Sequence, residues 1–137
     1  LADHLAARGY SCDKLHGGIA QATRERVMAK FRRRGVDLLV ATDVAARGLD
    51  VDDIEVVFNY DLPQDAEDYV HRIGRTARAG ASGKAISLAC EQYVFSLEAI
   101  EDYLGFKLPV KETDESLMAQ PKPHQRRRRG HGRGGDR

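Results

Sequence analysis

The sequence predicts an α/β fold in which a parallel β-sheet lies between layers of α-helices. Apolar segments of strand length alternate with amphipathic segments of helix length along the chain, a pattern typical of parallel sheets with right-handed crossovers. In addition, residues 36–42 (VDLLVAT) and 54–59 (IEVVFN) are almost continuously apolar. Such runs are typical of strands that helices cover on both faces.

Each element follows from the apolar pattern and from its end signals. Residues 21–34 are predicted to form a helix that stops at Gly35, because glycine often terminates helices. Residues 65–78 are predicted to form another helix, since acids in its first turn complement the helix dipole. The other expected strands are 10–15 and 84–90, and the other expected helices are 1–10 and 91–104.

The chain is expected to comprise one domain and a tail. It begins with Leu1 rather than Met, inside what resembles the second half of an amphipathic helix. We therefore expect a fragment of a larger protein, with an N-terminally truncated domain over 1–108 and an extension over 109–120. Residues 121–137 are rich in Arg and Gly, and the pattern predicts disorder there because apolar anchors are lacking.

Composition excludes several classes of protein. The formal net charge is +1, but residues 121–137 carry +6 and the preceding 120 residues carry −5, an asymmetry that indicates nucleic-acid contact. No apolar run approaches the ~20 residues of a membrane-spanning helix, and a signal-peptide pattern is absent from the N-terminus. Cys12 and Cys90 lack CxxC spacing, which favours a reducing compartment. We expect a cytoplasmic protein without a membrane partner.

Several common catalytic motifs are missing. The nearest match to the phosphate loop GxxxxGK[ST] is at Gly83 and Lys84. It fails, because Arg78 occupies the first glycine position and Ala85 the hydroxyl position. The five histidines lack the spacing of metal ligands, so no metal site is expected.

Residues 69–80 (YVHRIGRTARAG) hold a concentrated group of cations. On a helix, His71, Arg75 and Arg78 fall on one stripe about 60° wide, opposite a cluster of apolar side chains. Cations without interleaved acids are expected where an anion binds, and the planar fork of Arg suits phosphate oxygens. A solvated basic helix face fits this spacing equally well.

A second segment, 41–51 (ATDVAARGLDV), begins where the predicted strand 36–42 ends. Ligands of open α/β sheets bind beyond the carboxyl ends of strands. The segment offers the Thr42 hydroxyl, the Arg47 guanidinium, the Gly48 backbone and the Asp50 carboxylate, which suits ribose hydroxyls. A structural loop in which Asp43 or Asp50 caps a following turn is the alternative.

The third segment, 15–24 (LHGGIAQATR), joins a strand to a helix N-terminus, which is a natural site for phosphate. Arg24 in the first helical turn is placed to meet a nucleic-acid backbone. An ordinary surface arginine explains the same position.

These three segments, in this order and spacing, resemble the second RecA-like domain of the DEAD-box RNA helicases. HRIGRTARAG (71–80) is similar to motif VI of that family, and ATDVAARGLD (41–50) is similar to motif V. HGGIAQATR (16–24) is similar to the HG…QxxR segment. The resemblance covers roughly residues 1–105 and implies a three-layer αβα fold of the RecA type. The stretch 86–105, followed by KLPV and the basic tail, resembles a bacterial type within the family.

The resemblance implies a role for each matched residue of a nucleotide site. Arg75 and Arg78 correspond to arginines that contact the γ-phosphate of ATP bound on a first domain, with Arg78 as the arginine finger. Asp50 corresponds to the acid that meets the ribose, next to Gly48. The implied cofactor is ATP, with Mg²⁺ bound mainly by the first domain, which the chain lacks. We therefore expect the fragment alone to be inactive.

The resemblance also implies partners. His71 and Arg72 correspond to residues that couple the two domains across a cleft. Contacts with the RNA sugar-phosphate backbone are implied for Gly17, Arg24, Thr42 and Arg47. Ala77 stands where the family more often has Gly, and we expect little harm because Ala is the better helix former. The bacterial type is associated with RNA degradation, which makes an RNase E-type partner plausible.

Other functions stay open. The four consecutive arginines of the tail, Arg126, Arg127, Arg128 and Arg129, suit nonspecific RNA binding or simply keep the chain soluble. The domain could be a non-catalytic module that docks RNA or a protein. A DNA helicase domain is a third interpretation, although HRIGRT argues against it.

Overall fold

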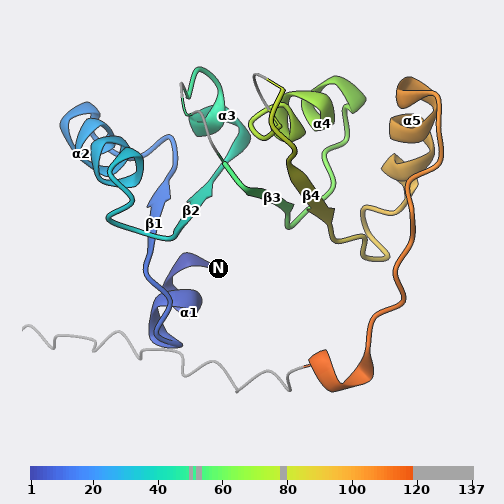
Figure 1. The fold of residues 1–137 in the computed structure, drawn as a ribbon, viewed down its shortest axis with the longest axis horizontal. Helices are drawn as coiled ribbons and strands as arrows, with labels where there is room; N and C mark the ends of the chain where they lie inside the picture. Colours follow the sequence, from blue (N-terminus) through green and yellow to red (C-terminus); the bar gives the residue numbers. More distant parts are fainter. Residues whose placement is uncertain (50, 52–53, 78–79, 119–137) are drawn as a thin grey trace, which may run out of the picture. The chain divides into compact units, whose positions relative to one another are not determined.

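The computed structural model describes residues 1–49, 51, 54–77 and 80–118. The chain divides into two compact units, Leu1–Lys107 and Leu108–Arg137, and each is considered by itself. The first unit holds, in chain order, α1 (Ala2–Ala7), β1 (Cys12–Leu15), α2 (Gln21–Arg32), β2 (Leu38–Ala41), α3 (Asp43–Ala46), β3 (Val56–Asn59), α4 (Ala66–Ile73), β4 (Lys84–Ser87) and α5 (Phe95–Leu104) (Figure 1). The described part of the second unit contains a short 3-10 helix, η1 (Glu115–Leu117). Within the described ranges, none of the helices is long and apolar enough to cross a membrane.

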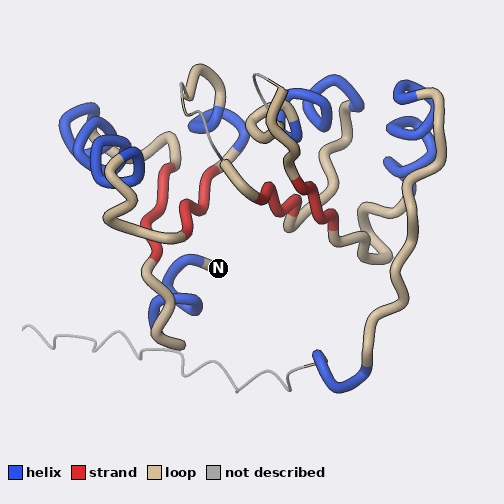
Figure 2. The backbone as a smooth tube through the Cα atoms, viewed as in Figure 1, coloured by secondary structure: helices blue, strands red, loops and turns tan. Residues whose placement is uncertain are grey.

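The strands pair in two parallel ladders. β1 pairs with β2, beginning with Cys12 opposite Leu38, and β3 pairs with β4, beginning with Val56 opposite Lys84. Helix α2 connects the first pair and helix α4 the second, so each pair forms a βαβ unit (Figure 2). The predicted α/β fold with parallel strands is therefore confirmed.

The hydrophobic core of the first unit includes the short helix after β2. Leu15 of β1, Met28 of α2 and Ala45 of α3 are buried and belong to one cluster with Val27 and Val51. Burial of this kind contributes roughly 25 cal/mol per Å² of apolar surface removed from water. Helix α3 is thus held against β1 and α2 by packing.

Several elements are shorter than predicted, among them α5 and β2. Helix 91–104 was expected, but α5 begins at Phe95, because the preceding residues form a turn in which Val94 N donates to Cys90 O. The strand expected over 36–42 is shorter, and three of its residues are only half-buried while Ala41 is exposed.

Candidate functional site

Residues 42–49, here called the post-β2 segment, follow the carboxyl end of β2. Thr42 is the N-cap of α3, and its Oγ1 accepts a hydrogen bond from Ala45 N at 3.4 Å. The cap is therefore Thr42, while Asp43, which the sequence suggested as a cap, lies in the first helical turn. Gly48 has a φ of 74° and no atom within 4 Å of the position a Cβ would take. The backbone at Gly48 is open to the close approach of a ligand.

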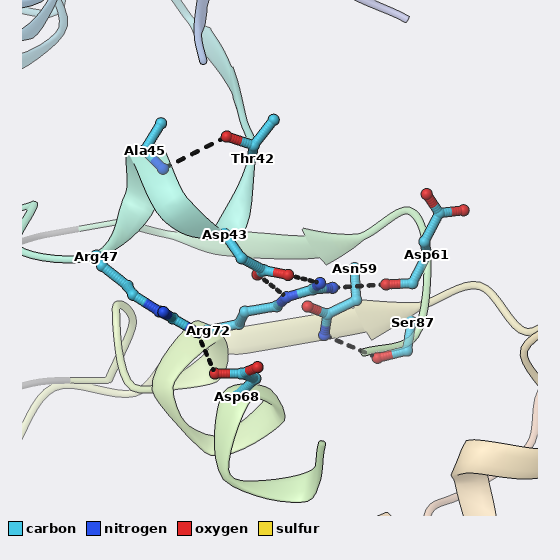
Figure 3. Close-up of polar contacts among 9 residues, drawn as sticks. All are labelled: Thr42, Asp43, Ala45, Arg47, Asn59, Asp61, Asp68, Arg72 and Ser87. Carbon is cyan, nitrogen blue, oxygen red and sulfur yellow. Dashed lines mark hydrogen bonds and ion pairs between the residues drawn. The ribbon is translucent and has the colours of Figure 1, made fainter. Parts of the chain in front are cut away.

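Arg72 of α4 binds the post-β2 segment through a fork (Figure 3). Its Nε donates to Asp43 Oδ1 and its Nη2 to Asp43 Oδ2, both at 2.7 Å. Its Nη1 donates to Asp61 O at 2.5 Å. The hydrogen bond from Arg72 is the main cause that lowers the pKa of Asp43 below its ordinary value. The guanidinium of Arg72 therefore connects helix α4 to the post-β2 segment and to the loop after β3.

A second ion pair joins the same two parts of the chain. Arg47 Nη2 lies 3.3 Å from Asp68 Oδ1, as Figure 3 shows. The post-β2 segment thus supplies Asp43 and Arg47, and helix α4 supplies Asp68 and Arg72. In both, the acid precedes the arginine by four residues. We call these four residues the cross-paired cluster.

Arg24, in the first turn of α2, reaches the same segment from the other direction. Its Nη2 donates to Ala45 O at 2.6 Å. A hollow of about 200 Å³ lies beside it, lined by Gln21, Arg24, Glu25, Met28, Arg32, Gly48 and Leu49. Gly17, in the loop between β1 and α2, has open space where a Cβ would stand. Arg24 and Gly48, assigned from sequence to different ligands, therefore line one hollow.

The helix predicted over 65–78 ends at Ile73. Thr76 instead forms a parallel bridge with Ile54, and its hydroxyl donates to Ile54 O. The prediction that Arg75 shares a helical stripe with His71 is therefore wrong. The reason is a tertiary contact that the helical pattern does not contain.

Arg75 nevertheless reaches the candidate site. Its Nη1 donates to Leu49 O at 2.6 Å. The post-β2 segment thus accepts hydrogen bonds from three arginines of other elements, namely Arg24, Arg72 and Arg75. This convergence of guanidinium groups on one short segment is the main feature of the site.

Ala77 departs from the expectation drawn from helix propensity. Its φ is 57°, a left-handed conformation that costs a non-glycine residue roughly 1–2 kcal/mol. Gly83 approaches so closely that a Cβ there would overlap Thr76 Oγ1. The expectation that Ala77 does little harm is wrong. Helix α4 has already ended at Ile73, and the left-handed backbone at residue 77 favours Gly.

The remaining predicted site residues are placed as follows. His71 is exposed on α4, and its Nε2 lies 4.0 Å from Glu67 Oε1. Asp50, Arg78, Arg126, Arg127, Arg128 and Arg129 lie outside the described residues.

Sequence reasoning missed the acids that pair with the arginines. The sequence predicts Asp43 only as a cap, and Asp68 only as one of the acids that complement the dipole of helix 65–78. The spacing of an acid four residues before an arginine occurs in both 43–47 and 68–72. That repeated spacing is the signal that could have identified both, although their cross-pairing depends on the tertiary fold.

Comparison with known proteins defines the class. The family model of the helicase conserved C-terminal domain matches residues 1–80. A crystal structure of the E. coli DEAD-box protein SrmB bound to regulator of ribonuclease activity A is 38% identical, with a TM-score of 0.77, and the match covers 88% of this chain and 72% of that chain. The chain therefore belongs to the helicase conserved C-terminal domain family, and within it to the DEAD-box RNA helicases.

Two further similarities indicate which DEAD-box helicases this chain resembles. The chain is 58% identical over 122 residues to the ATP-dependent RNA helicase RhlB of Salmonella arizonae, a match that covers 88% of this chain and 29% of that protein. The structure of S. cerevisiae Dbp5 bound to RNA and ADP BeF3 is 36% identical with a TM-score of 0.69, covering 78% of this chain and 30% of that chain. The resemblance of the stretch 86–105 to a bacterial type is confirmed, and that type is RhlB. The chain spans less than a third of the length of these curated relatives.

Proposed function

We propose that this chain supplies the arginine-bearing half of an ATP-driven RNA-unwinding site. The observation that carries the proposal is the convergence of Arg24, Arg72 and Arg75 on the post-β2 segment, which also presents Arg47. Arginine is suited to this purpose because its planar fork bonds two phosphate oxygens at once. Relatives are named ATP-dependent RNA helicases, which supports RNA over DNA as the nucleic acid.

On the nucleotide side, Arg75 and Arg78 are proposed to contact the γ-phosphate, with Arg78 as the arginine finger. Asp50 and Gly48 are proposed to meet the ribose end of ATP. The described residues fit such a group, since Arg75 binds the carbonyl of Leu49, next to the open backbone of Gly48. A first RecA-like domain would hold the phosphates and Mg²⁺, and His71 and Arg72 are proposed to face that domain.

On the nucleic-acid side, Gly17, Arg24, Thr42 and Arg47 are proposed to bind the RNA backbone. Arg47 is well suited to this role, because its side chain is 66% exposed and its contact with Asp68 is long, at 3.3 Å. Contacts to phosphates and sugars position a strand without reading its bases. Binding is therefore expected to be largely independent of sequence.

The tail and the domain limits belong to the same proposal. We place the helicase C-terminal domain at 1–108, an extension at 109–120 and an Arg/Gly-rich tail at 121–137. The four arginines at 126–129 would add nonspecific electrostatic attraction for RNA. A cytoplasmic location fits the two cysteines, which the structure leaves unbridged.

Docking of a protein partner is a second proposed function. Phe95 and Tyr103 of α5 are exposed, at 85% and 61%, and the similar SrmB structure has a regulator of ribonuclease activity bound. An RNase E-type component of an RNA-degradation complex is the proposed partner. Capture of such a component by the immobilised chain, lost in a Phe95→Ser variant, tests this function.

The RNA and ATP assignments are tested together with the purified 137-residue chain. We expect it to bind single-stranded RNA and to hydrolyse no ATP, because it carries arginines for the γ-phosphate but lacks a phosphate loop. An Arg47→Gln variant should bind RNA more weakly, whereas Arg33→Gln, at an exposed position at the end of α2, should bind normally. RNA-stimulated ATP turnover by the chain alone would contradict the proposal that another domain must supply the phosphate loop.

A further inference from the structure

The cross-paired cluster joins the post-β2 segment to helix α4 with a defined register. The earlier residue of one part pairs with the later residue of the other, so that Asp43 meets Arg72 and Arg47 meets Asp68. Two pairs of opposite polarity in this arrangement resist sliding of one part along the other, because a shift would place like charges opposite each other. The cluster therefore fixes where the post-β2 segment sits along α4.

The two pairs are unequal. The fork between Arg72 and Asp43 has two bonds of 2.7 Å, and the side chains are 21% and 38% exposed. The pair of Arg47 with Asp68 is a single contact at 3.3 Å, and Arg47 is 66% exposed. A bidentate, partly shielded pair fixes orientation as well as distance, whereas an exposed single contact contributes little and exchanges readily. Arg72 is thus the persistent link, and Arg47 is the cation that can exchange its partner for a phosphate.

We propose that Arg72 is a positioning residue for RNA binding, which acts through Asp43 to hold the post-β2 segment so that Thr42 and Arg47 meet the RNA backbone. The inference rests on the proposed function of the chain. It gives Arg72 an effect inside this domain, in addition to the proposed contact with the first domain, and it requires no contact between Arg72 and RNA. It also links the two sides of the site, because the segment that Arg72 holds provides the carbonyl of Leu49 to Arg75.

A double-mutant cycle tests whether Arg72 acts through Asp43. The affinity of the purified chain for a fluorescent oligouridine is measured by anisotropy for wild type, Arg72→Gln, Asp43→Asn and the double variant. A hydrogen bond to a charged group contributes roughly the free energy of a tenfold change in an equilibrium constant. Because RNA binding is proposed to require the segment that the fork holds, each single variant should bind about tenfold more weakly. The double variant should bind no more weakly than either single one, because both changes break the same link. Losses that multiply in the double variant would overturn the proposal, as would single variants with wild-type affinity.

Two further variants separate geometry from charge. Arg72→Lys keeps the positive charge but cannot form the fork, so it should bind RNA as weakly as Arg72→Gln. Arg33→Gln removes the same charge from an exposed position and should retain wild-type affinity. Full affinity of Arg72→Lys would show that charge alone suffices and would reject the positioning role.

A readout independent of affinity keeps the test decisive if Arg72→Gln does not fold. In amide NMR spectra of Asp43→Asn, resonances of residues 46–49, which are not adjacent to the substitution, should shift while those of β4 stay in place. Unchanged resonances at residues 46–49 would refute the proposed action of the fork on that segment. If the wild-type chain binds no RNA, both the proposed function and this inference fail. If it binds RNA but the losses of the two single variants multiply in the double variant, only the inference is rejected.

Discussion

Asp43 accepts two hydrogen bonds from the guanidinium of Arg72. The negative charge of Asp43 is required for this fork, which organises the candidate site. The hydrogen bond from Arg72 lowers the pKa of this carboxyl, and the charges of Arg72 and Arg47 act in the same direction against the opposing effect of burial. At residue scale, the site therefore depends on a carboxylate that binds Arg72 of a different helix. The sequence predicted the cations, but the acids that meet them lie 29 and 21 positions away in the chain.

A pH dependence follows from Asp43. Because its folded pKa lies below that of the unfolded chain, about 3.9 for a free aspartate, the stability that the fork contributes is fully present above that value. It is lost as the pH falls through the lower, folded pKa. Unfolding measured by circular dichroism should therefore show a steeper loss of stability between neutral and acid pH for wild type than for Asp43→Asn. Identical pH profiles of the two proteins would count against the pair.

Ala77 gives a second prediction at residue scale. Because its φ of 57° is unfavourable for a side chain, Ala77→Gly should raise the free energy of unfolding by about 0.5–1 kcal/mol, after the entropy cost of glycine. Urea denaturation measures the difference. The matched control is Ala29→Gly within α2, which should lower the free energy of unfolding by about 1 kcal/mol. A destabilising Ala77→Gly would refute the left-handed assignment.

At the scale of elements, local pattern predicted most of the fold. The strand–helix alternation placed the four strands and the helices α2, α4 and α5, since apolar periodicity and end signals are local. It failed where tertiary contacts decide, as at the end of α4, where Thr76 leaves the helical path to pair with Ile54. It also missed α3, four residues long, because so short a helix is held by packing of Ala45 rather than by propensity.

Gly83 tests the contact that ends α4. A Cβ at this position would overlap Thr76 Oγ1 and Ala77 N, so Gly83→Ala must displace the bridge between Thr76 and Ile54. We expect a loss of roughly 1–3 kcal/mol in the free energy of unfolding, as for other overpacked sites. Thermal or urea unfolding gives the value. Gly17→Ala, at a position with open space, serves as the control, and equal effects of the two changes would contradict the close approach.

At the scale of the whole molecule, charge is divided unevenly along the chain. The first 120 residues carry −5 and residues 121–137 carry +6. The acidic part still gathers cations in one place, because Arg24 and Arg75 donate hydrogen bonds to the post-β2 segment, which itself carries Arg47. Net charge therefore indicates nucleic acid through the tail, whereas the site that we propose lies in the domain.

Removal of residues 121–137 separates these two contributions. The truncated chain should bind RNA more weakly at low salt and with a smaller slope of log affinity against log salt, because fewer phosphate counterions are released. Affinity at high salt should change less, since the contacts of the domain remain. Filter binding over a range of salt concentrations measures both. An unchanged slope would show that the tail does not contact RNA.

This chain is proposed to supply the arginines that complete an RNA-dependent ATPase site. The most direct test of this proposal is the rate of RNA-stimulated ATP hydrolysis by a two-domain protein in which this chain follows the nucleotide-binding domain of an RhlB relative. Arg78→Ala should lower kcat by roughly 10³-fold or more, as for other arginine fingers, with little change in ATP affinity, while Arg33→Ala should leave kcat unchanged. Wild-type turnover by the Arg78→Ala protein would contradict the account.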